Sequence, residues 1–176
     1  MARSLRAAST STLSLGTFVL VPSLVARANA PAGRYDLTVD SATDNETGLV
    51  WQRRARTSAT SCAGEISGEC TLLATTCGTD ATCTPAEATA YCDGLQLGGA
   101  STWRLPSLAE LVSLIDVTRY DPAVDPIAFA DTPAEFFWTS SPYVGPPADY
   151  TWRVSFQVGT SSVAANTQAA RVRCVR

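Results

Sequence analysis

The chain has 176 residues and a formal net charge of −3, from thirteen basic and sixteen acidic side chains. All thirteen basic residues are arginine, and both histidine and lysine are absent. These counts exclude a histidine-based catalytic triad, a histidine-ligated metal and a serine–lysine pair. The sequence pI of about 4.9 excludes the basic surface of a nucleic-acid-binding protein. An apolar content of 45% with 16% charged residues is typical of a globular chain of one domain.

The first 28 residues have the three parts of a secretory signal. Arg3 and Arg6 form a basic start, an apolar stretch follows at residues 13–26, and Ala26-Arg27-Ala28 offers a cleavage site. The apolar stretch is shorter than the roughly 17–25 residues that a membrane-spanning helix needs. We therefore expect a signal peptide at 1–28 and an exported domain at 29–176, in the periplasm, at the cell surface or outside the cell. Cleavage leaves ten basic and sixteen acidic side chains, a net charge of −6.

Two short strands are predicted at the start of the exported chain. Residues 34–39 alternate in polarity and include β-branched side chains, and residues 49–52 follow a turn at 44–48.

The six cysteines predict disulfides, because an even number in an exported chain is typical of a covalent framework. No two of them have the C-x-x-C spacing that favours zinc. Four lie in a stretch without clear periodicity, and we expect them to pair among themselves and to staple an irregular insertion at about 54–83. The remaining two are then left for each other. The four are Cys62, Cys70, Cys77 and Cys83, and the remaining pair is Cys92 with Cys174.

Two helices are predicted in the middle of the chain. Thr84-Pro85-Ala86-Glu87 combines a capping box with proline at the first helical position, and an apolar stripe runs to Leu95 before two glycines. Ser107-Leu108-Ala109-Glu110 is a second capping box, and its helix is expected to end near Asp116. Cys92 falls on the apolar stripe of the first helix, so it is expected to be buried.

The last third of the chain predicts strands. Residues 136–140 form a short apolar run, residues 152–158 alternate, Gly159-Thr160 suits a hairpin turn into residues 161–164, and residues 171–176 alternate again. Strands at both ends with two short helices between them predict an α+β fold.

Five fragments, taken in chain order, resemble the Lcl C-terminal domain family, an exported bacterial domain family of unknown function. They lie at residues 44–52, 90–92, 103–111, 137–141 and 172–176. The arginine–leucine–proline helix start and the terminal Arg-Cys-Val-Arg are also similar to the formylglycine-generating-enzyme branch of the C-type-lectin-like folds. The resemblance implies a compact, C-type-lectin-like α+β domain with two short helices, short antiparallel strands, and N- and C-terminal strands close together.

The resemblance also implies adhesion, because the family is named for the end domain of a collagen-like surface adhesin that binds host glycans. The cysteine-rich stretch is an insertion beyond the family pattern. The net charge of −6 disfavours sulfated polyanions. A glycan ligand is therefore expected to be neutral or held through a cation.

Four aspartates on a proline-stiffened loop are candidate calcium ligands, since calcium prefers oxygen donors. They are Asp116, Asp121, Asp125 and Asp131. The alternative is a solvated acidic loop in which the aspartates cap turns. No EF-hand spacing or C-type-lectin calcium motif is present, and no other cofactor is expected. Asp121 and Asp125 are also candidate ligand-binding residues.

Aromatic residues near the prolines at 146 and 147 are candidates for a sugar-binding surface. Tyr143 and Tyr150 are expected at the surface, whereas Trp138 and Trp152 lie on apolar strand faces and are expected in the core. Arg53, Arg54 and Arg56 either hold an anion or form a solvated edge, and Arg104 is expected to form a structural ion pair.

Catalysis has little support in these residues, and we expect no enzyme. The preferred function is non-catalytic binding of a surface or matrix glycan. One alternative is a structural envelope or secreted module that recognises a protein partner. A cysteine-dependent enzyme of the formylglycine-generating type is the other alternative.

Overall fold

The computed structural model describes residues 33–56 and 68–176. It has two three-stranded antiparallel sheets and short helices, which is the α+β class expected from the sequence. The expected signal peptide and Cys62 lie outside the described residues. Within the described part of the chain, no helix is long and apolar enough to cross a membrane.

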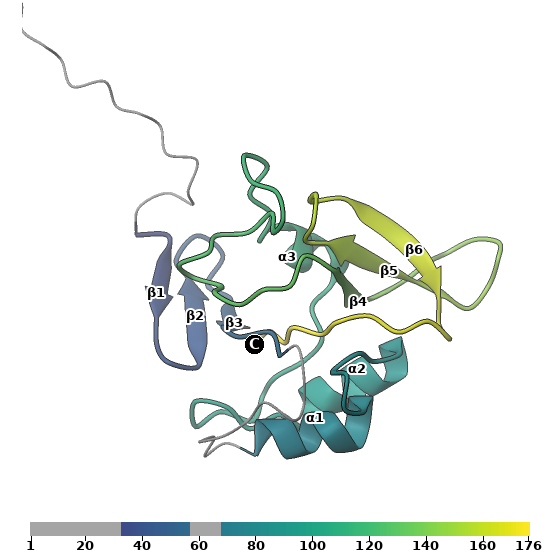
Figure 1. Cartoon of the computed structure of the whole chain (residues 1–176), viewed down its shortest axis with the longest axis horizontal. Helices are drawn as coiled ribbons and strands as arrows, with labels where there is room; N and C mark the ends of the chain where they lie inside the picture. The colour runs from purple at the N-terminus through teal and green to yellow at the C-terminus, as the bar shows by residue number, and fades with distance from the viewer. Residues whose placement is uncertain (1–32, 57–67) are drawn as a thin grey trace, which may run out of the picture.

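The first sheet has the strand order β1-β2-β3 and the second has the order β4-β5-β6 (Figure 1). The helices α1, α2 and α3 lie between the two sheets in the sequence. The bounds are β1 Tyr35–Leu37, β2 Ser41–Asp44, β3 Val50–Gln52, α1 Glu69–Cys77, α2 Pro85–Gly94, α3 Leu108–Val112, β4 Phe136–Pro142, β5 Tyr150–Ser155 and β6 Ser161–Ala165.

The predicted strand at 34–39 is present but shorter, because its last residues form the turn of a hairpin. β1 ends at Leu37, and the backbone N–H of Thr38 donates to the carbonyl of Ser41 at 2.8 Å, which closes a turn into β2. The side chain of Thr38 accepts from the Ser41 N–H at 2.9 Å. This local side-chain bond is typical of turns and competes with an extended strand.

Both predicted helix starts are confirmed, and a third helix was missed. Thr84 caps α2 and Ser107 caps α3, each with a complete capping box. α1, however, occupies the stretch that was predicted to be irregular, so the expectation of two helices is wrong. α1 follows Gly68, which has the left-handed φ of 67°. The buried residues of α1 include Cys70, Leu73 and Cys77, and its exposed positions are Thr71 and Thr75, whose small side chains give the sequence little contrast in polarity.

The last residues of the chain connect the two sheets rather than forming a separate strand. Arg176 and Val50 exchange two backbone hydrogen bonds of 2.9 Å, and Val175 exchanges two with Arg104 on its other side. Arg171 bonds through its backbone to Phe136 at 2.8 Å and to Trp138 at 3.0 Å. The chain end therefore lies close to the N-terminal strands, as expected, and runs on between the sheets (Figure 1).

Two apolar clusters form the core. The first packs α1 and α2 against β4 and includes Tyr91, Trp103 and Trp138. The second packs α3 between the sheets and includes Trp51 and Phe137. Trp138 is fully buried, as expected, and its indole N–H donates to the Cys83 carbonyl at 2.6 Å.

Disulfides join the first core cluster covalently. Cys77 pairs with Cys83, and Cys92 pairs with Cys174 across 82 residues of sequence. Both pairs agree with the expected division of the cysteines. Cys70 is also disulfide-bonded. The pair Cys92–Cys174 fastens the chain end to α2, so the last strand-like segment cannot leave the core while this bond is intact.

Candidate binding surface

The β4–β5 hairpin brings three aromatic side chains to one side of the second sheet. Pro142 pairs with Thr151, so the next residue, Tyr143, lies opposite Tyr150, and the N–H of Tyr143 donates to the Tyr150 carbonyl at 2.9 Å. Side chains alternate along a strand, so Tyr150 and Trp152 point to the same side. We call Tyr143, Tyr150 and Trp152 the aromatic face.

The rings of the aromatic face are held in a defined arrangement. The rings of Tyr143 and Trp152 meet edge to face, with centroids 5.9 Å apart and an interplanar angle of 72°. A Cβ atom on Gly145 would lie 3.2 Å from the Tyr143 hydroxyl, so the phenol ring packs against the loop backbone there. All three side chains are half-buried. The rings of Tyr143 and Trp152 therefore support one another, and all three side chains of the aromatic face remain partly accessible.

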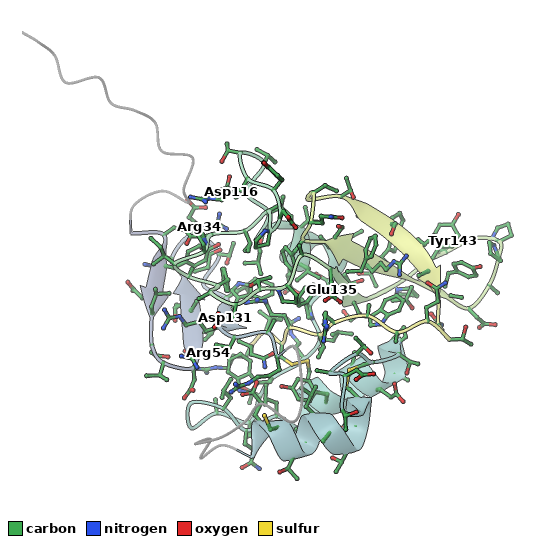
Figure 2. The ribbon with its side chains drawn as sticks, in the orientation of Figure 1. Arg34, Arg54, Asp116, Asp131, Glu135 and Tyr143 are labelled. Carbon is green, nitrogen blue, oxygen red and sulfur yellow. A yellow bond between two sulfur atoms is a disulfide. The ribbon has the colours of Figure 1, made fainter. Side chains whose placement is uncertain are left out.

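Polar groups on the aromatic face remain available to a ligand. In the part of the chain that the structure describes, the hydroxyls of Tyr143 and Tyr150 make no hydrogen bond to the protein. The neighbouring Val144 is 91% exposed. Figure 2 shows Tyr143 on the projecting loop after β4, far from Arg54 and Asp116. The surface combines apolar rings with free hydroxyl groups and carries no charged side chain of its own.

The strands below fix the aromatic face in place. The Thr139 hydroxyl donates to the Trp152 carbonyl at 2.7 Å, and the Thr151 hydroxyl donates to Asn166 Oδ1 at 2.8 Å. The N–H of Asn166 donates to the Asp149 carbonyl at 2.8 Å, which closes the other side of β5. A surface built on paired strands loses little conformational entropy when it binds a ligand.

The structure brings together Tyr143 and Tyr150, the two tyrosines expected at the surface, and adds Trp152 to them. The expectation that Trp152 lies in the core is wrong, because it is only half-buried. The neighbouring Val154 on the same side is fully buried in the core with α3. Val154 and Trp152 therefore differ in burial although they lie on the same side of β5, and strand periodicity alone cannot show this difference.

The four candidate calcium ligands do not converge. Asp116 pairs with Arg119 at 3.2 Å, and the buried Asp125 accepts from the N–H groups of Ile127 and Ala128 at 2.7 and 2.9 Å. Asp121 and Asp131 are exposed, and Figure 2 shows Asp131 well apart from Asp116. Within residues 33–56 and 68–176, no group of three or more acidic, cysteine or histidine side chains is placed to hold a metal ion. The turn-capping interpretation fits Asp125.

The arginines after β3 are used mainly inside the protein. Arg53 donates to the Thr38 carbonyl at 2.7 Å and to two carbonyls of the 127–128 loop, and Arg56 pairs with the buried Glu69 at 3.2 Å. Arg54 is exposed. Arg104 forms the expected ion pair, since both of its terminal nitrogens contact Glu110, at 2.6 and 2.8 Å. This run of arginines therefore does not form a joint anion-binding site.

A buried polar network lies under β3, and no pattern in the sequence predicts it. The Gln52 amide donates to Glu69 and to the Tyr91 hydroxyl, and its carbonyl oxygen accepts from the Cys174 N–H at 3.0 Å. Burial, and secondly the charge of Glu69, raise the pKa of Tyr91 well above its ordinary value. A neutral tyrosine, a carboxylate and an amide that satisfy one another inside the protein stabilise the fold and offer a ligand no access.

Comparison with protein-family models matches residues 40–176 to the Lcl C-terminal domain. A search of curated proteins finds no match.

Proposed function

The chain belongs to the Lcl C-terminal domain family, and from this premise we propose that it is an exported, non-catalytic binding domain that recognises a neutral carbohydrate through the aromatic face. The observation that carries the proposal is the edge-to-face pair of Tyr143 and Trp152, half-buried and fixed on a paired hairpin. Aromatic rings with a polar tip are suited to ligands that have one apolar face and one polar, hydrated face. The C–H groups of a sugar ring stack on such rings while its hydroxyls meet the tyrosine oxygens.

The disulfides support export and a binding role. Disulfides persist in oxidising compartments outside the cytosol. Among the described residues every cysteine is disulfide-bonded. A disulfide-bonded sulfur is not the thiolate that a cysteine-dependent enzyme needs. Titration of free thiols in the unfolded, unreduced protein tests the absence of such a thiolate, and two reactive thiols per chain, the number that one unformed disulfide leaves among six cysteines, would favour the enzyme alternative.

A glycan array with matched variants tests the carbohydrate proposal. We expect the disulfide-bonded protein to bind a set of neutral glycans and Trp152→Ala or Tyr143→Ala to weaken that binding at least about tenfold, as loss of a stacked aromatic does at a binding surface. Tyr120→Ala is the control, because Tyr120 is 80% exposed and the next residue, Asp121, bonds to Gln157, beyond the opposite end of β5. Near-ultraviolet circular dichroism confirms that each variant is folded.

The outcome separates the remaining alternatives. Equal binding by wild type and Trp152→Ala would rule out the aromatic face, and a silent array would favour the protein-partner alternative. The array is repeated with calcium and with a chelator. Loss of signal on chelation would show that a cation takes part.

A further inference from the structure

The outer edge of β6 is an unprotected strand edge. Among the described residues β6 pairs only with β5, and no isolated bridge involves it. Its five residues, 161–165, include no charged residue and no proline. Natural sheets guard exposed edges with charges, prolines or bulges, because a bare edge pairs with other strands. The other open edge, β1, has three residues and carries the exposed Asp36.

The hydrogen-bond pattern shows which backbone groups of β6 are free. The Thr160 carbonyl, just before β6, accepts from the Ser155 N–H at 2.7 Å. The Asn166 N–H, just after β6, donates to the Asp149 carbonyl at 2.8 Å. Because bonded and non-bonded pairs alternate in an antiparallel ladder, Ser162 and Ala164 face β5 as well. The N–H and carbonyl groups of Ser161 and Val163 therefore point outward. β6 is partly exposed along this edge, since both residues are accessible.

A cation without an acidic partner lies over this strand. Arg153 pairs with Ser162 across the ladder, and its Nε donates to the Ser162 hydroxyl at 3.3 Å. Its Nη1 donates to the Gln168 side chain at 3.3 Å, and its guanidinium stacks on Phe136 at 4.0 Å. Within the described residues Arg153 has no carboxylate partner, whereas Glu135, close in sequence to Phe136, is held by Arg171 at 3.0 Å. Burial alone lowers the pKa of Arg153.

We propose that the edge of β6 binds an extended peptide segment of a partner protein by strand addition, and that Arg153 selects a segment with an acidic side chain opposite Ser162. In strand addition the backbone groups of Ser161 and Val163 bond the incoming strand, about 4.8 Å from β6. The residue opposite Ser162 then points to the same side as Ser162 and Arg153, within reach of the guanidinium. Arg153 and Ser162 lie on the opposite side of the sheet from Trp152, so the choice of an acidic side chain does not depend on the proposed carbohydrate binding.

Peptide titration followed by NMR tests the proposal. The probe is an acetylated and amidated eight-residue peptide that alternates threonine and valine, with one central glutamate. We expect amide shifts and slowed hydrogen exchange at Ser161 and Val163, and about fivefold weaker binding when the glutamate is replaced by glutamine. Arg153→Gln should remove the preference for glutamate, whereas Arg54→Gln, at an exposed arginine elsewhere, should keep it.

Blocking the edge provides the second test. Val163→Pro removes an outward N–H and no bond to β5, so it should abolish binding; a peptide N-methylated along one edge does the same without altering the protein. Binding that survives both changes, or shifts confined to other residues, would overturn the proposal. So would an equal affinity for the glutamate and glutamine peptides, or a dimer in sedimentation that Val163→Pro dissociates, which would assign the edge to a second copy of the chain.

Discussion

Arg173 shows how one residue joins distant segments. Its side chain is completely buried, donates to the carbonyls of Gln52 and Arg53 at 3.0 Å, and donates to the Thr132 hydroxyl at 2.6 Å. Its guanidinium lies 4.7 Å from the centre of the Phe129 ring. Burial lowers the pKa of Arg173 to about 9. The charge is kept in the core by neutral oxygens and an aromatic ring.

We predict that Arg173→Lys lowers the free energy of unfolding by about 2 kcal/mol, because an ammonium group cannot reach carbonyls and hydroxyl in the fork geometry of a guanidinium. The measurement is urea unfolding at pH 7. Arg54→Lys, at an exposed arginine, serves as the control and should change stability by less than about 0.5 kcal/mol. Equal effects of the two substitutions would contradict the role given to Arg173.

At the scale of elements, the start of α3 is fixed by one carboxylate. Glu110 accepts from the Ser107 N–H at 2.8 Å and from both terminal nitrogens of Arg104. The hydrogen bonds from Arg104, with those from Ser107, hold the pKa of Glu110 at about 2, against an ordinary value of 4.5. α3 in turn packs under the second sheet, where Leu111 is fully buried.

Glu110→Gln keeps the capping box but removes the ion pair with Arg104. Because the folded-state pKa is depressed, the stabilisation is present above pH 4.5 and is lost as the pH falls toward 2. We predict a loss of about 0.5–1 kcal/mol at pH 7, since Arg104 is half-exposed and solvent screens the pair. The difference from wild type should disappear near pH 2, as measured by urea unfolding across this pH range.

Glu87→Gln is the matched control for that series. Glu87 completes the capping box of α2 with Thr84 in the same way, at 2.8 and 2.9 Å, and has no arginine partner among the described residues. A loss at pH 7 as large as that of Glu110→Gln would show that the cap, rather than Arg104, carries the effect.

At the scale of the whole molecule, the Cys92–Cys174 disulfide closes a loop of 82 residues that holds most of the domain. The Cys77–Cys83 disulfide spans only six. On the chain-entropy account a disulfide stabilises more when its loop is longer. The two disulfides therefore differ in their expected contribution to the free energy of unfolding, although both are buried in the same core cluster.

Replacing Cys92 and Cys174 together by alanine is predicted to cost about 4–5 kcal/mol, against about 2–3 kcal/mol for Cys77 and Cys83. Urea unfolding of the two double variants measures the difference. An equal loss would mean that the entropy of the closed loop does not set the stability of this domain.

The sequence by itself determined the local features of this protein. Both capping boxes, at Thr84 and Ser107, act within four residues, and the structure has them where they were predicted. The final hairpin of the second sheet and the α+β class follow from short-range patterns in the same way. The division of the described cysteines was also expected, because four of the six lie close together in the sequence and leave Cys92 for Cys174.

Only the tertiary structure decided which residues meet across the chain. α1 forms because Leu73 and its neighbours bury a face against the core, although their sequence shows little periodicity. Trp152 joins the tyrosines because the hairpin register places it beside Tyr143, and the candidate calcium aspartates separate because each serves its own turn or lies on its own loop. Arg173 and Arg153 look alike in sequence, yet one is closed in by carbonyls and the other lies over an open strand. The physical reason is that burial and partnership depend on packing between elements, which local spacing does not encode.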